Sequence, residues 1–295
     1  MTDLVSYLIN GALTGLLYAL VAMGFVVIYR ASRVFNFAQG EFVVIGGFLV
    51  WWFSLDMGLP IWAGVLLALL GAALLGLVIE RVFFRRLIGE SVFSMVMITI
   101  ALLILLRGVV LVVWGPQVRP FPRVFPTEDI VILGDVFIQQ SLLWGGAITI
   151  LLAIGMGWFF TRTRRGLMMS AVAEDHQIAL SLGISVRRSV ALAWVLGTTL
   201  SAVGAIVFLS GKSLTFLASD IGLIALPVAL LAGVESVTGL IPAGLIVGIS
   251  ASLTALYIDP LIGGSASTVV PYLIMLLILF IRPTGLFGWE TIERV

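Results

Sequence analysis

The sequence contains no cysteine and a single histidine, His176. Without cysteine there are no disulfides, no thiolate catalysis and no cysteine-ligated metal sites, and one histidine argues against a histidine-rich metal site or a Ser-His-Asp triad. Charged residues are also scarce: they make up 11% of the 295 residues, against about 25% in ordinary soluble proteins. The net charge of +1 provides no positive field for phosphates, which excludes a basic nucleic-acid binder.

Hydrophobic residues, in contrast, make up 61% of the chain, and the mean hydropathy is +1.22. Too few polar residues remain to cover a water-soluble fold, so the composition predicts an integral membrane protein. The first apolar run, from Leu4 to Tyr29, exceeds the roughly 7–15 residues of a signal-peptide core, and Asp3 precedes it instead of Lys or Arg. We therefore expect a retained first span.

A helix needs about 20 apolar residues to cross the bilayer. Strong candidates are 4–29, 61–79, 92–113, 141–160, 190–211 and 267–281. The run 42–54 is short, and 221–257 is long but interrupted by glycine, Glu235 and proline, which predicts two helices at about 221–234 and 239–257. The sequence thus predicts one all-α, polytopic membrane domain over 1–295, with 8–9 transmembrane segments and two broken helices.

Arginines mark the cytoplasmic side, because loops on that side carry an excess of Lys and Arg. They cluster in alternate loops, at 30 and 33, at 81, 85 and 86, between 162 and 188, and at 282 and 294. This predicts an N-terminus outside and a cytoplasmic C-terminus. The external loop 114–140 is rich in proline and aromatic residues, which favours an ordered cap or a lateral helix over a gate.

The long cytoplasmic loop, 161–188, contains a helical pattern of apolar residues with a polar group formed by Glu174, Asp175, His176 and Gln177. Gly183 is placed to end this short helix. The helix could lie on the membrane surface or present a knob to a soluble partner. Helices on lipid surfaces usually carry Lys and Arg, so the acidic pair favours the partner.

Five blocks, in order, resemble the permease subunits of branched-chain amino-acid ABC importers, above all the H-type subunit of the leucine/isoleucine/valine system. They are GALTGLLYALVAMGFVVIYR at 11–30, VFNFAQGEF at 34–42, IERVFFRRL at 79–87, AEDHQIALSLGI at 173–184 and IRPTGLFG at 281–288. In two places the sequence departs from the family. Gln39 stands where histidine is common, and in 229–248 Glu235 and Thr238 replace a small residue and a proline.

The resemblance implies a permease in the bacterial inner membrane that carries branched-chain amino acids or related small carboxylates. It implies a periplasmic binding protein, two ATP-binding subunits and a second, M-type permease as partners, and no cofactor or metal of the chain's own. It also implies that Glu174, Asp175, His176 and Gly183 belong to a helix that couples to the ATPase. No GxxxxGK[ST] phosphate loop is present, so ATP would bind to the partners.

Ionisable residues inside spans are costly and point to function. Glu41, Arg107, Asp220 and Glu235 are such candidates. Arg107 lies about two turns from the outer end of its span, so its position favours a side chain that reaches the headgroups over a functional role. Glu235 lies at a helix break, where irregular backbone requires protein or a water-filled cavity around it. It either lines the pathway or ends a helix at a membrane face, paired with an arginine.

Asn36, Gln39, Gly40 and Glu41 cluster where a short helix begins. A helix N-terminus favours anions such as a substrate carboxylate, so these residues either line the pathway or cap the helix. The two broken regions, one in each half, suggest an inverted repeat. The spacings Gly11…Gly15 and Gly244…Gly248 predict close helix packing.

Two other functions remain to be weighed. A secondary carrier driven by an ion gradient could use Glu41, Asp220 and Glu235 for protons or sodium, although it would not need a cytoplasmic docking helix. An intramembrane enzyme is the weakest alternative, because the spans contain no HExxH, GxSxG or paired-aspartate arrangement.

Overall fold

The computed structural model describes residues 2–87, 90–132 and 136–288. In this part of the chain six helices are long and apolar enough to cross a membrane. They are α1 (Thr2–Ser32), α3 (Ile61–Val82), α4 (Val92–Val113), α5 (Gln140–Arg162), α8 (Val186–Leu209) and α10 (Leu240–Tyr257). The chain is therefore an all-α polytopic membrane protein, as the hydropathy predicts.

Shorter helices complete the bundle. They are α2 (Gln39–Trp51), which continues into the π-helix η1 (Trp52–Asp56), then α6 (Arg164–Glu174), α7 (His176–Ser181), α9 (Asp220–Ala232), α11 (Asp259–Ile262) and α12 (Val270–Ile281), with the 3-10 turns η2 (Phe84–Arg86), η3 (Phe216–Ser219) and η4 (Ala266–Thr268). α12 has 12 residues, a length of about 18 Å at 1.5 Å per residue. The span predicted at 267–281 is thus a shorter helix that follows η4.

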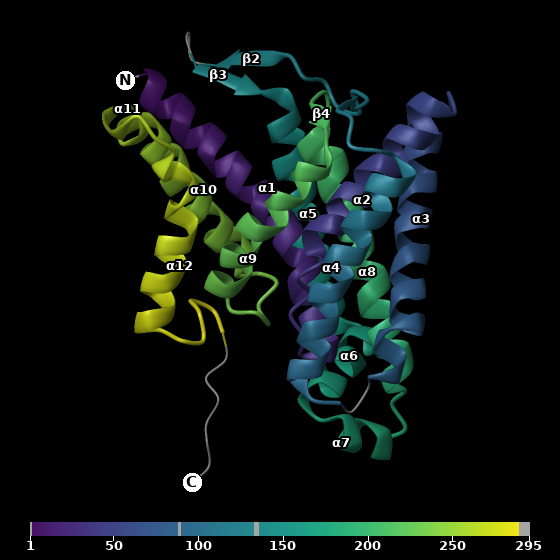
Figure 1. The fold of residues 1–295 in the computed structure, drawn as a ribbon. Coiled ribbons are helices and arrows are strands. Elements are labelled where there is room, and N and C mark those ends of the chain that lie inside the picture. Colours follow the sequence, from purple (N-terminus) through teal and green to yellow (C-terminus); the bar gives the residue numbers. More distant parts are fainter. Residues whose placement is uncertain (1, 88–89, 133–135, 289–295) are drawn as a thin grey trace.

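α1 and α8 form the centre of the bundle. Their most apolar windows are 78% and 67% buried, whereas those of α3 and α4 are 22% buried. α8 packs against α1, α2 and α3, and α1 packs along α10. In Figure 1, α10 and α12 lie on one side of α1 and the α3/α4 pair on the other. The outer helices keep one apolar face free for lipid.

The α1–α10 crossing is made by glycines. A Cβ at Gly15 would collide with the carbonyl oxygen of Gly244, and one at Gly248 would collide with the backbone of Gly11 and Gly15. The two backbones therefore touch directly, which confirms the packing predicted from the glycine spacings.

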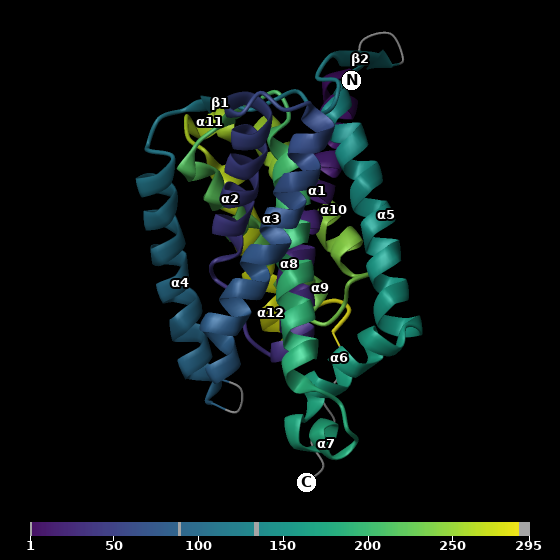
Figure 2. The ribbon, with the colours of Figure 1, turned by 90° about the vertical axis from the view of Figure 1, so that its right-hand side faces the viewer.

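Of the two forms predicted for the loop 114–140, an ordered cap or a lateral helix, the structure contradicts the helix. The loop contains no lateral helix among its described residues but short strands: β1 (Arg119–Pro120) pairs antiparallel with β4 (Ser213–Leu214), and β2 (Asp129–Ile132) pairs with β3 (Val136–Gln139). Proline has no N–H to donate to a helix, and the loop's prolines fit extended chain instead. Figure 2 shows the β2–β3 hairpin at the end of the molecule opposite α7.

The segment 161–188 also differs from its prediction: the single helix expected there is two helices, α6 and α7. Asp175 separates them with an extended backbone, and its carboxylate accepts the N–H groups of Gln177 and Ile178 at 2.7 and 2.9 Å. A side chain that caps a new helix in this way ends the preceding one. α7 ends at Ser181, and Gly183 then adopts a left-handed φ of 75°.

Candidate functional site

The break between α1 and α2 is held by buried amide side chains. Asn36 and Gln39 are both 0% exposed. Asn36 accepts the N–H of Ala38 and donates to the Gln39 side chain, both at 3.1 Å, and Gln39 donates to the Ser201 hydroxyl of α8 at 2.7 Å. Irregular backbone inside a membrane requires such internal partners. In this conformation both side chains hold the break, and their role in a substrate pathway stays a prediction.

Gly40 brings the first turn of α2 against the start of α9. A Cβ at Gly40 would collide with the carbonyl oxygen of Ser219, and one at Gly222 would meet the backbone of Gly40. Only glycine permits this approach. The two short helices, one from each half of the sequence, therefore meet in the interior of the bundle, where Glu41 lies in the first turn of α2 and Asp220 in the first turn of α9.

Arg107 of α4 reaches into this junction. Its Nε and Nη2 donate to Oε1 of Glu41 at 2.9 Å, and Nη2 donates to the Ser219 hydroxyl at 2.6 Å. The expectation that Arg107 extends to the headgroups is therefore wrong. A buried carboxylate needs a paired cation, and the side chain of Glu41 is only 1% exposed. Glu41 therefore attracts Arg107 more strongly than the lipid headgroups do.

A cavity of about 160 Å³ lies at this junction. Its polar lining comes from Gly40, Glu41, Arg107, Ser219 and Asp220. Gly40 and Glu41 thus lie where the sequence predicted a polar site at a helix start. Arg107 comes from α4, and Ser219 and Asp220 come from the second half of the sequence, so only the three-dimensional structure brings them to the same cavity.

At the end of the bundle from which α6 and α7 project, Arg33 connects two elements. It donates to the Glu174 carboxylate at 2.8 Å, to the Ala173 carbonyl at 3.0 Å and to the Glu235 carboxylate. Glu174 ends α6, while Glu235 lies in the turn between α9 and α10. Arg33 thus bridges α6 to the turn that follows α9, and Glu235 is paired with an arginine in this conformation.

The residues predicted to couple to an ATPase occupy different positions on α6 and α7. Glu174 has a side chain 72% exposed despite its ion pair, and Asp175 caps α7. His176 is the first residue of α7, and its side chain lies outside the described part of the structure. Gly183 follows α7 with open space around its Cα. α6 and α7 project from one end of the bundle (Figures 1 and 2).

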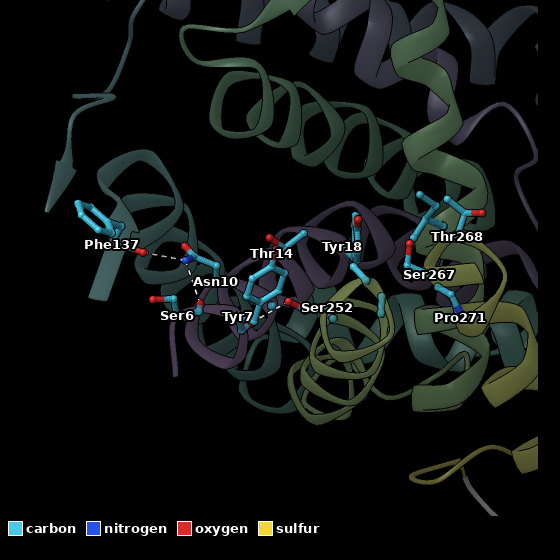
Figure 3. Close-up of a pocket in the computed structure, with 15 residues that line it drawn as sticks. Ser6, Tyr7, Asn10, Thr14, Tyr18, Phe137, Ser252, Ser267, Thr268 and Pro271 are labelled. Carbon is cyan, nitrogen blue, oxygen red and sulfur yellow. Dashed lines mark hydrogen bonds between the residues drawn. The ribbon is translucent and has the colours of Figure 1, made fainter. Parts of the chain in front are cut away.

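A larger groove, of about 770 Å³, lies between α1, α10, η4 and the start of α12. Ser6, Asn10, Thr14 and Tyr18 line it from α1, and Figure 3 shows them following one another along that helix. Ser252 faces α1 from α10 and donates to the carbonyl of Tyr7 at 2.7 Å. Sequence reasoning from ionisable residues does not predict this groove, because its polar lining consists of hydroxyls and an amide. The signal was a polar residue at every fourth position of the first span.

Neither cavity has the chemistry of a metal or nucleophilic centre. Among the described residues, no three His, Asp or Glu side chains come together to hold a metal ion. The smaller cavity offers one carboxylate pair and one guanidinium, and the larger one offers hydroxyls and an amide.

Curated relatives cover nearly the whole chain. The high-affinity branched-chain amino acid transport system permease protein LivH of Escherichia coli K12 is 28% identical over 301 residues, which cover 97% of this chain and 96% of that protein. The corresponding protein BraD of Pseudomonas aeruginosa is 29% identical over 304 residues, 98% and 97% of the two chains. A probable LivH of Methanocaldococcus jannaschii is 25% identical over 295 residues, with coverage of 95% and 91%.

Among solved structures, PsaBC from Streptococcus pneumoniae in complex with Fab aligns with 94% of this chain and 92% of its own, at 17% identity and a TM-score of 0.49. The family described as "Branched-chain amino acid transport system / permease component" matches residues 7–279, almost the full length. On this match the chain belongs to the branched-chain amino acid transport system permease family.

Proposed function

We propose that this chain is a permease subunit of an ABC importer that moves branched-chain or related amino acids, or small carboxylates, across a bacterial inner membrane. Family membership supports the transport class. The observation that carries the coupling mechanism is the Arg33 bridge. It connects α6, at its exposed Glu174, to the turn that follows α9.

The energy for transport comes from partners in this proposal. The sequence has no GxxxxGK[ST] loop to hold a nucleotide's phosphates. α6 and α7 dock onto one of two ATP-binding subunits, and closure of that pair displaces them. Arg33 passes the displacement to Glu235, which moves the end of α9 and, with it, the cavity at the start of α9. A periplasmic binding protein delivers the cargo, and a second permease, either an M-type subunit or another copy, completes the pathway.

The orientation follows from the same scheme. α6 and α7 face the cytoplasm with the arginine clusters, so α1 begins outside and the segment after α12 is cytoplasmic. α2 and α9 are the corresponding short helices of an inverted repeat. Both are 13 residues long, both carry an acid in the first turn, and they run from a common junction. These features support the repeat, which is detectable in the sequence only as two interrupted spans.

Reconstitution with the ATPase subunits tests the proposal. Glu174→Gln removes the exposed charge at the end of α6, and Asp175→Asn removes a charge but keeps an effective helix cap. We expect both variants to assemble and hydrolyse ATP, and we expect the combined variant to lose most ATP-driven uptake in proteoliposomes. Normal uptake by the combined variant would contradict the coupling role.

A secondary carrier is the alternative that the buried acids leave open. If the purified chain alone, in vesicles with a proton or sodium gradient, accumulates an amino acid, that alternative replaces the importer. If uptake requires the ATPase subunits and ATP, the importer stands.

A further inference from the structure

The cavity at the α2–α9 junction contains a carboxylate, that of Glu41, of which only one oxygen accepts hydrogen bonds within the described chain. Glu41 is 1% exposed, and its Oε1 accepts both hydrogen bonds from Arg107. Its other oxygen, Oε2, is buried and has no hydrogen-bond partner among the described residues. A buried charged acceptor without a donor is costly. The free oxygen lies beside a cavity, so a ligand with N–H donors would satisfy it.

Next to this acceptor, the guanidinium of Arg107 also has a nitrogen that is free to donate. Arg107 uses Nε and Nη2 for Glu41 and Ser219, whereas Nη1 makes no hydrogen bond within the described part of the chain. Guanidinium binds carboxylates well because its donors form a planar fork. The first turn of α2, at Gly40, adds the partial positive charge of a helix N-terminus. The cavity thus has one anionic and one cationic pole.

The net charge of the lining selects between classes of ligand. Glu41 and Arg107 neutralise each other, and Asp220, exposed at the start of α9, leaves the lining with an excess negative charge. A simple carboxylate meets this excess as repulsion, whereas an ammonium group compensates it. The lining therefore suits a molecule that carries both charges.

The cavity also has an apolar side. Leu223 and Leu226 of α9 line it, and Leu223 is 50% exposed on the bundle surface. The volume of about 160 Å³ is well above the roughly 10–15 Å³ that one water molecule needs on the same measure. This is room for the charged end of an amino acid, with an aliphatic side chain extending over the leucines. Pro227, inside α9, has no N–H for the carbonyl of Leu223, which leaves one more acceptor at this wall.

We propose that this cavity binds the ammonium and carboxylate groups of a free α-amino acid in transit, so that the permease itself distinguishes an amino acid from a plain carboxylate. The ammonium lies between Glu41 Oε2 and Asp220, and the carboxylate lies at Arg107 Nη1. The inference rests on the proposed transport function and narrows its cargo to zwitterions. Ser219 acts as a positioning residue, because its hydroxyl orients Arg107.

The test measures binding to the assembled permease–ATPase complex in nanodiscs, without the binding protein. L-leucine is the radiolabelled probe. Its competitors are 4-methylpentanoate, which lacks the ammonium, and 3-methylbutylamine, which lacks the carboxylate. We expect each competitor to be weaker than unlabelled leucine by about tenfold or more, because each leaves one charged pole unpaired.

Single-residue variants test which residues bind the ammonium group of leucine. Glu41→Gln is expected to weaken leucine while leaving 4-methylpentanoate unchanged or improved. Asp220→Asn, at an exposed position that does not endanger folding, is expected to shift the ratio in the same direction by a smaller factor. Glu80→Gln is the matched control, because Glu80 is a buried glutamate with an unpartnered oxygen outside this cavity. It should leave the competition ratios unchanged.

Two results would overturn the zwitterion site: leucine that does not bind the complex, or a leucine-to-carboxylate ratio that Glu41→Gln and Asp220→Asn leave unchanged. ATP-driven leucine uptake, measured with the binding protein on the same preparation, separates this failure from that of the proposed function. If ATP-driven uptake is intact but zwitterions are not preferred, only the zwitterion site is ruled out. If uptake does not depend on ATP, the importer function is ruled out.

Discussion

Gly15 and Gly244 determine how closely α1 and α10 approach. No side chain separates the two helices at this crossing, because a Cβ on either glycine would collide with backbone atoms of the other helix. Such a contact depends on van der Waals packing, since burial from lipid adds little hydrophobic drive. Even one methyl group at the crossing has to push the helices apart.

We predict that Gly15→Ala destabilises the protein by about 1–3 kcal/mol, the usual cost of overpacking. Gly155→Ala is the control. Gly155 lies inside α5 with open space around it, so there alanine should be neutral or should stabilise the helix by about 0.5–1 kcal/mol. Thermal unfolding of both variants in the same detergent measures the difference. Equal midpoints for the two would contradict the direct backbone contact.

At the residue scale, Asp259 joins the start of α11 to η4. Its carboxylate accepts the N–H of Ser267 at 3.0 Å and the Ser267 hydroxyl at 2.6 Å. The hydrogen bond from the Ser267 side chain holds the pKa of Asp259 below its ordinary value of 3.8. Because the pKa is lower in the folded state, this contact stabilises the fold above the ordinary pKa and is lost as the pH falls through the folded-state pKa.

The corresponding prediction is that Ser267→Ala raises the pKa of Asp259 toward 3.8. Carboxyl ¹³C chemical shifts, followed in a pH titration of the protein in nanodiscs, measure it directly. Ser265→Ala is a nearby control, since the Ser265 carbonyl, which alanine retains, is the group that bonds to Thr268. An unchanged Asp259 titration in Ser267→Ala would rule out the hydroxyl as the cause.

At the scale of elements, Arg33 joins α6 to the α9–α10 turn through a residue with an unusual backbone. Its φ is 56°, the only positive φ among the described non-glycine residues. This left-handed conformation costs a side-chain-bearing residue about 1–2 kcal/mol, and glycine adopts it freely. Arg33→Gly therefore removes the side chain without disturbing the turn.

We predict that Arg33→Gly assembles normally and lowers ATP-driven uptake several-fold at unchanged ATP hydrolysis, because α6 no longer moves the end of α9. Glu235→Gln should give a similar defect. The double variant should be no worse than either single variant, as expected for two residues in one linkage. Glu90→Gln serves as the control, because Glu90 is an exposed glutamate in the segment between α3 and α4. Fully additive defects would mean that Arg33 and Glu235 act separately.

Some elements follow from the sequence and others do not. The bilayer's thickness imposes a length on apolar runs, so the hydropathy places α3, α4, α5 and α8 to within a few residues, and glycine and Pro242 mark the break before α10. The split between α6 and α7 was also readable, because aspartate is a preferred helix cap. The pairing of β1 with β4 was not, since the partner strand lies far along the chain, as Leu214 does from Arg119.

The candidate site divides in the same way. Local sequence placed Gly40 and Glu41 at a helix start, because the polar cluster interrupts an apolar run. Arg107 could not be placed from its position in α4, since the choice between headgroups and Glu41 depends on which helix packs beside it. The polar stripe of α1 was visible in the sequence, but hydroxyls are tolerated in spans and carry a weaker signal than charges.

For the whole molecule, the orientation gives the broadest prediction. The natural chain has no cysteine, so a single introduced thiol reports from one place. Ser181→Cys, in α7, and Ser213→Cys, in β4, are matched substitutions at exposed positions. In intact cells a membrane-impermeant maleimide should label Ser213→Cys and spare Ser181→Cys until the cells are opened. The reverse pattern would invert the topology and remove the docking role of α6 and α7.

The C-terminal end of α9 is completed by residues from the very end of the described chain. The N–H groups of Leu286 and Phe287 donate to the carbonyls of Leu231 and Ala232 at 2.8 and 3.2 Å, and Gly285 and Gly288 pack against Gly233. The ribosome makes α10, α11 and α12 before it makes these partners. During synthesis, therefore, the last carbonyls of α9 have no partner until residues 285–288 are made, and this end of α9 is completed late.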